Sequence, residues 1–143
     1  MHSPSKDITR LIQQNLLGLS GNSLFIGKEP AQPNNCITVY DMGGGVQDAK
    51  FAVDEDFVQI RVRDVNYTTG YDKMSAIKLL LEGLNGFADV SVEPVSSEIV
   101  GIWVESQIAF LKSDENGRNI FTMTLKIVRK ETSLAEAGNR QIV

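Results

Sequence analysis

Hydrophobic residues near the start of the chain recur at the spacing of a helix. Ile8, Leu11, Ile12 and Leu16 lie three or four positions apart, which places them on one face of an amphipathic helix. Ser3 can cap such a helix, and the fixed backbone of Pro4 suits its first turn. The pattern therefore predicts a helix from about residue 3 to residue 17.

A second helical pattern predicts a helix from about residue 66 or 69 to residue 84. Between these helices the period changes to two. Val58, Ile60 and Val62 alternate with three polar residues, so we expect a strand over 57–63 with its apolar side chains in a core. Gln59, Arg61 and Arg63 should face outward. Other apolar runs predict strands over 24–26, 36–41 and 99–104, and Pro94 makes 90–95 an edge strand or an irregular segment.

The segment 106–129 predicts a hairpin. Asn116-Gly117 lies inside the polar turn 114–118, and this dipeptide readily adopts the positive φ angles of hairpin turns. From Phe121 to Ile127, apolar and polar residues alternate, which is typical of a strand with one buried face.

The order of these elements predicts an α+β fold: a mainly antiparallel sheet with two helices packed on one face. We expect residues 1–130 to form this single domain and residues 131–143 to form a short helix or flexible tail. The connection 42–56 is long for a compact domain, so we expect it to be mobile or functional.

The size and composition fit one ordinary globular domain. The chain has 143 residues, of which 42% are hydrophobic and 22% charged. It has no apolar run of roughly 20 residues, so we expect no membrane span. It begins without a secretory signal pattern, so we expect no export. The formal charge of −4 argues against strong nonspecific binding to nucleic acid.

Reactive groups are scarce, and the sequence predicts neither an enzyme nor a cofactor. His2 is the only histidine and Cys36 the only cysteine, so the common catalytic triads and zinc sites cannot be assembled. Cys36 is interpreted as a small buried hydrophobe. The cluster Gly43–Gly45 is interpreted as a hairpin connection rather than a phosphate cradle, because no helix pattern follows it. The aromatic residues Trp103, Tyr40, Tyr67 and Tyr71 are interpreted as core or near-core packing.

Several segments together resemble the tail terminator proteins of long-tailed bacteriophages, also described as minor capsid proteins. The resemblance covers roughly residues 7–130 and rests on the order of five segments: Leu24–Gly27 with the prolines and Asn34-Asn35-Cys36-Ile37 that follow; Val39-Tyr40-Asp41 with Gly43-Gly44; Val58–Arg63; Gly70–Lys73 leading to Leu84; and Phe110-Leu111 with the turn Asp114–Arg118 and Phe121.

The resemblance implies a structural virion protein without an active site. Such a subunit would form a ring, a hexamer in this reading, at the head-proximal end of the tail tube. The ring would halt tube growth and offer a surface for head joining. Its partners would be its own copies, the tail tube protein and the head–tail connector or stopper protein. DNA could pass through the ring without sequence-specific contact. The protein would be made in the bacterial cytoplasm and reside in the neck of the virion.

Interface residues are expected among charged groups that a neighbour could reach. They are three acidic residues of the predicted loop, two basic residues of the sheet and three charged residues of the hairpin turn: Asp54, Glu55, Asp56, Arg61, Arg63, Asp114, Glu115 and Arg118. Two other readings stay open. One is a head-completion or connector subunit of the same neck, and the other is a small ligand-binding or enzymatic domain that uses the Gly43–Gly45 loop.

Overall fold

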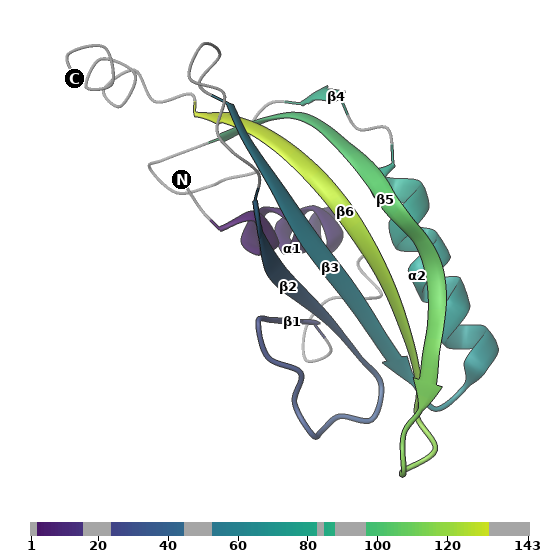
Figure 1. The fold of residues 1–143 in the computed structure, drawn as a ribbon. Coiled ribbons are helices and arrows are strands. Elements are labelled where there is room, and N and C mark those ends of the chain that lie inside the picture. Colours follow the sequence, from purple (N-terminus) through teal and green to yellow (C-terminus); the bar gives the residue numbers. More distant parts are fainter. Residues whose placement is uncertain (1–2, 16–23, 45–52, 83–84, 88–96, 132–143) are drawn as a thin grey trace.

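A computed structural model describes residues 3–15, 24–44, 53–82, 85–87 and 97–131 of the chain (Figure 1). Its elements, in chain order, are α1 (Pro4–Asn15), β1 (Leu24–Ile26), β2 (Cys36–Gly44), β3 (Val53–Asp64), α2 (Tyr67–Leu81), β4 (Asn85–Phe87), β5 (Ser97–Ser113) and β6 (Asn119–Glu131). The predicted strand over 90–95 and the predicted tail beyond β6 lie outside the described residues.

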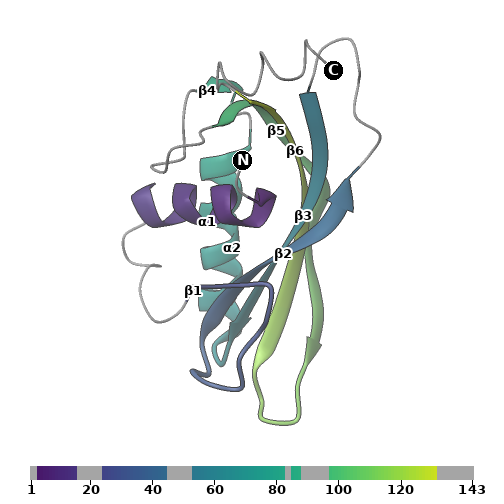
Figure 2. The same ribbon diagram turned by 90° about the vertical axis from the view of Figure 1, so that its left-hand side faces the viewer.

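The strands form one six-stranded sheet in the order β1-β2-β3-β6-β5-β4. β1 runs parallel to β2, and every other neighbouring pair is antiparallel. Both helices lie on the same face of this sheet (Figure 2). α1 packs against β1, β2 and β3, whereas α2 packs against β3, β6 and β5. The predicted α+β fold is therefore confirmed.

The core lies between the helices and the sheet. The alternation predicted for residues 57–63 places Val58, Ile60 and Val62 under the helices, where each is fully buried. β6 contributes every second residue from Phe121 to Ile127 to the same layer. The helices add Ile8, Leu11, Ile12, Met74, Ile77 and Leu81. Full burial of each of these side chains stabilises the folded state by roughly 1.5–3 kcal/mol, so this layer makes the main contribution to the stability of the fold.

Side chains cap both helices. The Oγ of Ser3 accepts a hydrogen bond from the backbone N–H of Lys6 at 3.3 Å, as its predicted role as a cap requires. Asp41 at the end of β2 accepts hydrogen bonds from the backbone N–H and the Oγ of Ser5, at 2.8 and 2.7 Å. This carboxylate fixes the start of α1 to the sheet and also suits the positive end of the helix dipole. Asn66 caps α2 by accepting from the N–H of Thr69 at 2.9 Å.

The predicted loop over 42–56 is wrong in extent. β2 continues to Gly44 and β3 begins at Val53, so residues 54–56 are strand residues rather than loop residues. Asp54 lies opposite Arg129 of β6, and Gly44 lies opposite Asp56. Cross-strand neighbours of this kind override the low intrinsic strand preference of aspartate. Gly43, with φ of +82°, lies at the irregular register between Asp41 and Gly44.

The hairpin is longer than predicted. β5 is one strand from Ser97 to Ser113 rather than a short strand followed by the hairpin arm, and it pairs with β6 along its whole length. Four register shifts interrupt this pairing. Such bulges bend a strand locally and re-aim its side chains. They explain why simple alternation in β5 does not predict which of its residues face the helices.

Candidate interaction surfaces

The described residues present no constellation of catalytic type. Cys36 is buried, as predicted, and burial raises the pKa of its thiol. Gly43 and Gly44 lie in the strand β2, and the next element of the described chain is the strand β3 rather than a helix that could bind phosphate at its N-terminus. Within the described ranges, no group of three or more Cys, His, Asp or Glu side chains could hold a metal ion. None of the described helices is both long enough and apolar enough to cross a membrane.

Arg63 does not face solvent, which corrects its prediction as an outward-facing residue. It lies on the helix-free face of the sheet, but the loop between β1 and β2 covers it and leaves only 3% of it exposed. Its Nε donates to the carbonyl oxygen of Asn34 at 3.1 Å. Its Nη2 donates to those of Pro33 and Ala31, at 2.7 and 3.3 Å. One guanidinium group thus donates hydrogen bonds to three loop carbonyl oxygens, which its planar arrangement of several N–H donors allows.

Glu29, from the same loop, completes this arrangement. Its carboxylate lies 3.3 Å from Nη1 of Arg63 and 3.1 Å from Nε of Arg61. Arg61 is about one quarter exposed, so a partner could still reach it. Both arginines were predicted to face outward as interface residues, but only Arg61 retains substantial accessible surface.

The hairpin turn is internally braced. Asp114 accepts hydrogen bonds from the backbone N–H groups of Asn116 and Arg118, at 3.0 and 2.9 Å, and from Nε of Arg118 at 2.7 Å. The backbone N–H of Arg118 is the main cause that lowers the pKa of the Asp114 carboxyl. Nη1 of Arg118 then donates to the carbonyl oxygen of Ala31 at 2.7 Å. Arg63 and Arg118 therefore converge on Ala31 and join the turn to the β1–β2 loop, at the lower end of the molecule (Figure 2).

The acidic residues of β3 also differ from their prediction as a solvated loop. The Oδ2 of Asp56 lies 3.2 Å from Nη2 of Arg129, whose Nη1 lies 2.9 Å from Oδ2 of Asp7 in α1. Asp7 and Arg129 are buried, so this cluster ties α1 to the sheet. Of the eight predicted interface residues, five thus make ion pairs or hydrogen bonds within the subunit: Asp56, Arg61, Arg63, Asp114 and Arg118. Glu115 is exposed at the turn and Glu55 is half-buried on β3. The interface role of all eight stays a prediction.

Aromatic residues cluster where α2 begins. The rings of Tyr67, Tyr71 and Phe110 surround the buried Phe121, with ring centroids 5.0–6.0 Å from its own. Edge-to-face contacts at these distances stabilise a fold beyond the area that they bury. Gly70 permits the approach, because a Cβ there would lie 2.9 Å from the Phe121 ring. Tyr67 and Tyr71 were predicted as core or near-core residues; they pack against the core through Phe121, but each leaves about half of its surface exposed.

Trp103 lies on the helix-free face and is also exposed, contrary to its prediction as a core residue. Its indole ring covers Gly101, where a Cβ would meet the ring at 2.5 Å. The Nζ of Lys126 lies 5.3 Å from the ring centroid, within the range of a cation–π contact. Glycine two positions earlier on the same strand is therefore what lets this tryptophan lie against the sheet.

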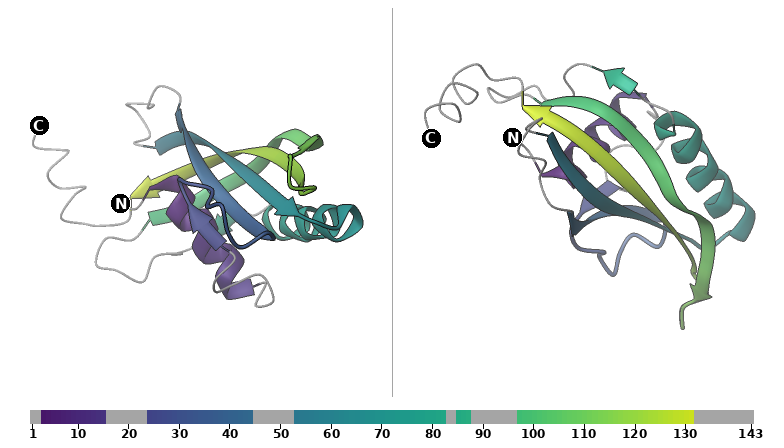
Figure 3. Two further views of the ribbon diagram at one scale, coloured as in Figure 1. Left: turned by 90° about the horizontal axis from the view of Figure 1, so that it is seen from below. Right: turned by 45° about the horizontal axis from the view of Figure 1, so that its top comes forward.

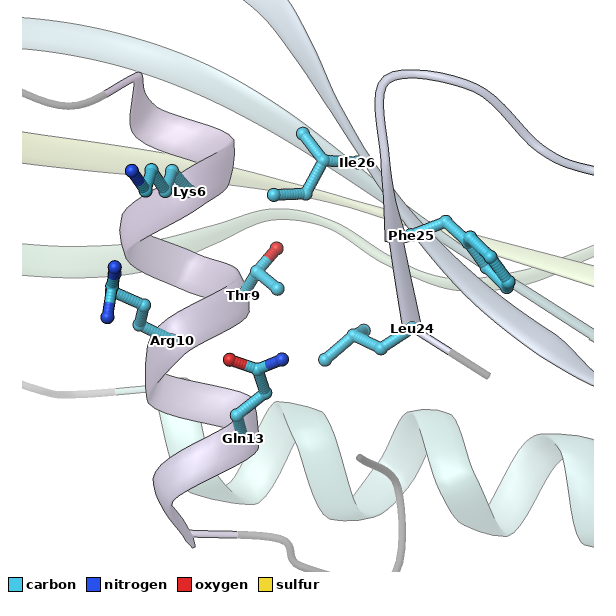
Figure 4. Close-up of a pocket in the computed structure, with 7 residues that line it drawn as sticks. All are labelled: Lys6, Thr9, Arg10, Gln13, Leu24, Phe25 and Ile26. Atoms are coloured by element: carbon cyan, nitrogen blue, oxygen red, sulfur yellow. The ribbon is translucent and has the colours of Figure 1, made fainter. Parts of the chain in front are cut away.

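A groove separates α1 from the edge strand β1 (Figure 4). Its volume is 370 Å³, and it is lined by Leu24–Ile26 of β1 and by Lys6, Thr9, Arg10 and Gln13 of α1. Leu24 and Ile26 extend toward α1, whereas Phe25 points away from it (Figure 4). The groove therefore combines an apolar wall on β1 with a polar, basic wall on α1.

Several residues of these surfaces were not predicted from the sequence. The lining of the groove brings together parts of α1 and β1 that no local motif connects. Phe110 contacts Tyr67 and Phe121 across the sequence and still leaves 45% of its surface exposed. A signal for Lys6 and Arg10 was present, because they lie one helical turn apart and off the apolar stripe of α1.

These features define a single-domain α+β subunit with braced loops, a helix-free sheet face and exposed aromatic side chains. A sequence model of the family described as bacteriophage tail terminator protein matches residues 11–131, so the chain belongs to the bacteriophage tail terminator family. This match confirms the resemblance that the sequence suggested, and the chain is a phage structural protein.

Among solved structures, the chain is similar to one from the virion of a native gene transfer agent (GTA) particle. The TM-score is 0.65 at 14% identity, and the similarity covers 90% of this chain and 95% of the other. At this identity the likeness shows a shared fold. No curated protein matches the sequence.

Proposed function

We propose that this protein terminates the tail of a long-tailed phage-type particle. Its subunits form a ring, a hexamer in our proposal, at the head-proximal end of the tail tube. The ring stops the addition of tube subunits and presents a surface to the head–tail connector or stopper protein. The observation that carries the proposal is the family match, which runs from Leu11 in α1 to the end of β6 and so includes the end of α1, all of α2 and the whole sheet.

The physical features of the subunit suit this role. A cyclic ring uses a heterologous interface, in which one patch of each subunit meets a different patch on the next. The helix layer, the helix-free face and the braced lower end give this domain three distinct surfaces. The bonds of Arg63 and Arg118 hold the β1–β2 loop in place before any partner arrives. Preorganisation of this kind lowers the entropy cost of association.

The proposed setting follows from the same assignment. The subunits are made in the bacterial cytoplasm and become part of the virion neck. The genome passes through the ring, and the subunit makes no sequence-specific contact with it. The chain acts as a structural component and not as an enzyme.

Light scattering during size-exclusion chromatography, with the protein alone and with purified tail tubes, tests the proposal. We expect ring-sized assemblies or protein bound at one end of each tube, which negative-stain microscopy would locate. A protein that stays monomeric and never binds tube ends would overturn the assignment. Deletion of the gene adds an independent test. Overlong tails are expected for a terminator, whereas tail-less particles with full heads would indicate a head-completion or connector subunit instead.

A further inference from the structure

Two basic residues of α1 make no ion pair within the described part of the chain, although most other described basic side chains do. Six basic side chains make ion pairs in the described part of the chain: Arg61, Arg63, Lys73, Arg118, Lys126 and Arg129. Lys6 and Arg10, which line the α1–β1 groove, make none with any described residue. Beside them Ile26 leaves 46% of its surface exposed in the apolar wall of the groove.

The outer face of α2 has the opposite character. Leu79 is 80% exposed, the largest fraction among the exposed large hydrophobic residues of the described chain. Asp72 lies seven residues earlier, two turns along the same side of the helix, and Glu82 lies three residues later at its end. Both are exposed, and neither makes an ion pair with a described residue. The buried residues Met74, Ile77 and Leu81 occupy the other side of α2.

One molecule cannot bring these two surfaces together. α1 packs over β1, β2 and β3, whereas α2 packs over β3, β6 and β5, so the two helices lie toward opposite edges of the sheet (Figure 3). The groove beside α1 and the acidic stripe of α2, which we define as Asp72 and Glu82, are therefore separate surfaces. A second copy can supply the missing surface. Because the two patches differ, the contact is head-to-tail and repeats from one copy to the next, as a ring requires.

We propose that the α1–β1 groove of one subunit receives the outer face of α2 from the next copy of the chain. Leu79 packs on the apolar wall formed by Leu24 and Ile26. Asp72 and Glu82 lie beside the basic wall formed by Lys6 and Arg10. The proposal rests on the proposed ring and names its subunit contact.

The chemistry favours a second copy over other partners. The groove offers an apolar wall as well as two positive charges, which suits a helix that carries a leucine between carboxylates. A polyanion such as DNA would use the charges alone and leave Ile26 exposed. The acidic stripe of α2 would in addition repel a polyanion, whereas it complements the groove of another subunit.

Charge reversal of each surface tests the contact. One variant carries Lys6→Glu with Arg10→Glu, and the other carries Asp72→Lys with Glu82→Lys. None of the four residues is buried, so thermal unfolding should confirm that both variants fold. Self-association, with and without tail tubes, is measured by light scattering and sedimentation. We expect each variant alone to associate at least tenfold more weakly than the wild type.

The equimolar mixture of the two variants is the decisive sample. Each interface of an alternating assembly would then join an acidic groove to a basic helix, or a basic groove to an acidic helix. We therefore expect the mixture to assemble, although neither variant does so alone.

Arg10→Glu and Lys112→Glu form a matched pair of single changes, since both reverse one charge. Lys112 lies on the hairpin away from the groove, so its variant should assemble normally.

Three outcomes would overturn the contact. Both double variants could assemble normally, or the mixture of the two variants could fail to assemble. Alternatively, the variants could lose tube binding alone and still self-associate, which would assign the groove to the tube protein. In each of these cases the wild type still assembles, so the proposed function stands. A wild-type protein that neither self-associates nor binds tubes would overturn both proposals.

Discussion

Replacing Arg63 with alanine should destabilise the domain strongly, although the residue sits among polar positions of a strand. The change removes donors from the carbonyl oxygens of Ala31, Pro33 and Asn34. It also removes one of the two cations beside Glu29. The carbonyl oxygens of Pro33 and Asn34 would lose their arginine donor, that of Ala31 would keep only Arg118, and the loop would lose most of its attachment to the sheet.

The expected loss follows from the burial of the group. Hydrogen bonds from a charged donor contribute about 1.5–3 kcal/mol each, and breaking a buried ionic group costs about 3–5 kcal/mol in total. Water can reach the exposed loop after the change, so the lower end applies, about 3 kcal/mol. With a urea dependence of about 1.5–2 kcal/mol per molar, the unfolding midpoint should fall by about 1.5–2 M.

Arg61→Ala is the matched control. Arg61 contacts the same carboxylate of Glu29, but it is partly exposed and holds no loop carbonyl, so its loss should cost about 0–1 kcal/mol. Arg63→Lys keeps the charge and loses the fork of donors, and it should recover only part of the stability. A second readout is the reactivity of the Cys36 thiol. Cys36 lies opposite Arg63 on the neighbouring strand, so its thiol should become more reactive when the loop detaches. Equal midpoints for Arg61→Ala and Arg63→Ala would refute this reasoning.

Three further predictions concern other parts of the fold. Phe121→Ala should lower the free energy of unfolding by about 3–5 kcal/mol, because it empties the centre of the aromatic cluster, whereas the half-exposed Phe110→Ala should cost clearly less in the same urea titration. Cys36 should react with a thiol reagent far more slowly in the native protein than in urea. Because burial raises the pKa of the Cys36 thiol, its contribution to stability should be complete below the unfolded-state pKa of about 8.5 and should decline as pH rises through the folded-state pKa. The Cys36→Ala variant should lack this pH dependence. The pKa of Asp114 is lowered, so its contribution should be present above the unfolded value of about 3.9 and disappear as pH falls through the folded one. A carboxyl titration by NMR should show this low value, and an ordinary value for Asp114 would contradict the bracing by Arg118.

The local elements of this fold are well determined by local patterns. The cap at Ser3, the helix spacing from Ile8 to Ile12 and the alternation in β3 depend on neighbours within a few residues. Each was predicted from the sequence and is found in the structure. The turn at Asn116-Gly117 belongs to the same class, because its backbone geometry is a property of the dipeptide.

The misassigned residues depend on partners far away in the sequence. Alternation places Arg63 on the helix-free face, but its burial depends on carbonyls about 30 positions earlier. Asp7 and Arg129 meet across 122 positions. Local preference likewise assigned residues 54–56 to a loop, and only the opposite strand β6 makes them part of the sheet. Sequence patterns give the direction of a side chain, whereas the distant segment that covers it comes from the topology.

Ion pairing also changes what the net charge says about partners. The formal charge of −4 indicates a mildly acidic protein and names no preferred surface. After folding, most described arginines are committed to pairs within the subunit. Among the described cations that make no ion pair, Lys6 and Arg10 lie together on α1, and among the described carboxylates that make none, Asp72 and Glu82 lie on the outside of α2. In a two-fold symmetric dimer, a patch of one copy faces the same patch of the other copy. If α1 or α2 lay at the centre of such an interface, residues of like charge would face each other. A head-to-tail contact places unlike charges together at every interface. Charge of this kind selects the partner and speeds its encounter, while the exposed Leu79 supplies the apolar contact. The uneven use of charge inside the fold therefore favours repeated association in one direction over a closed pair.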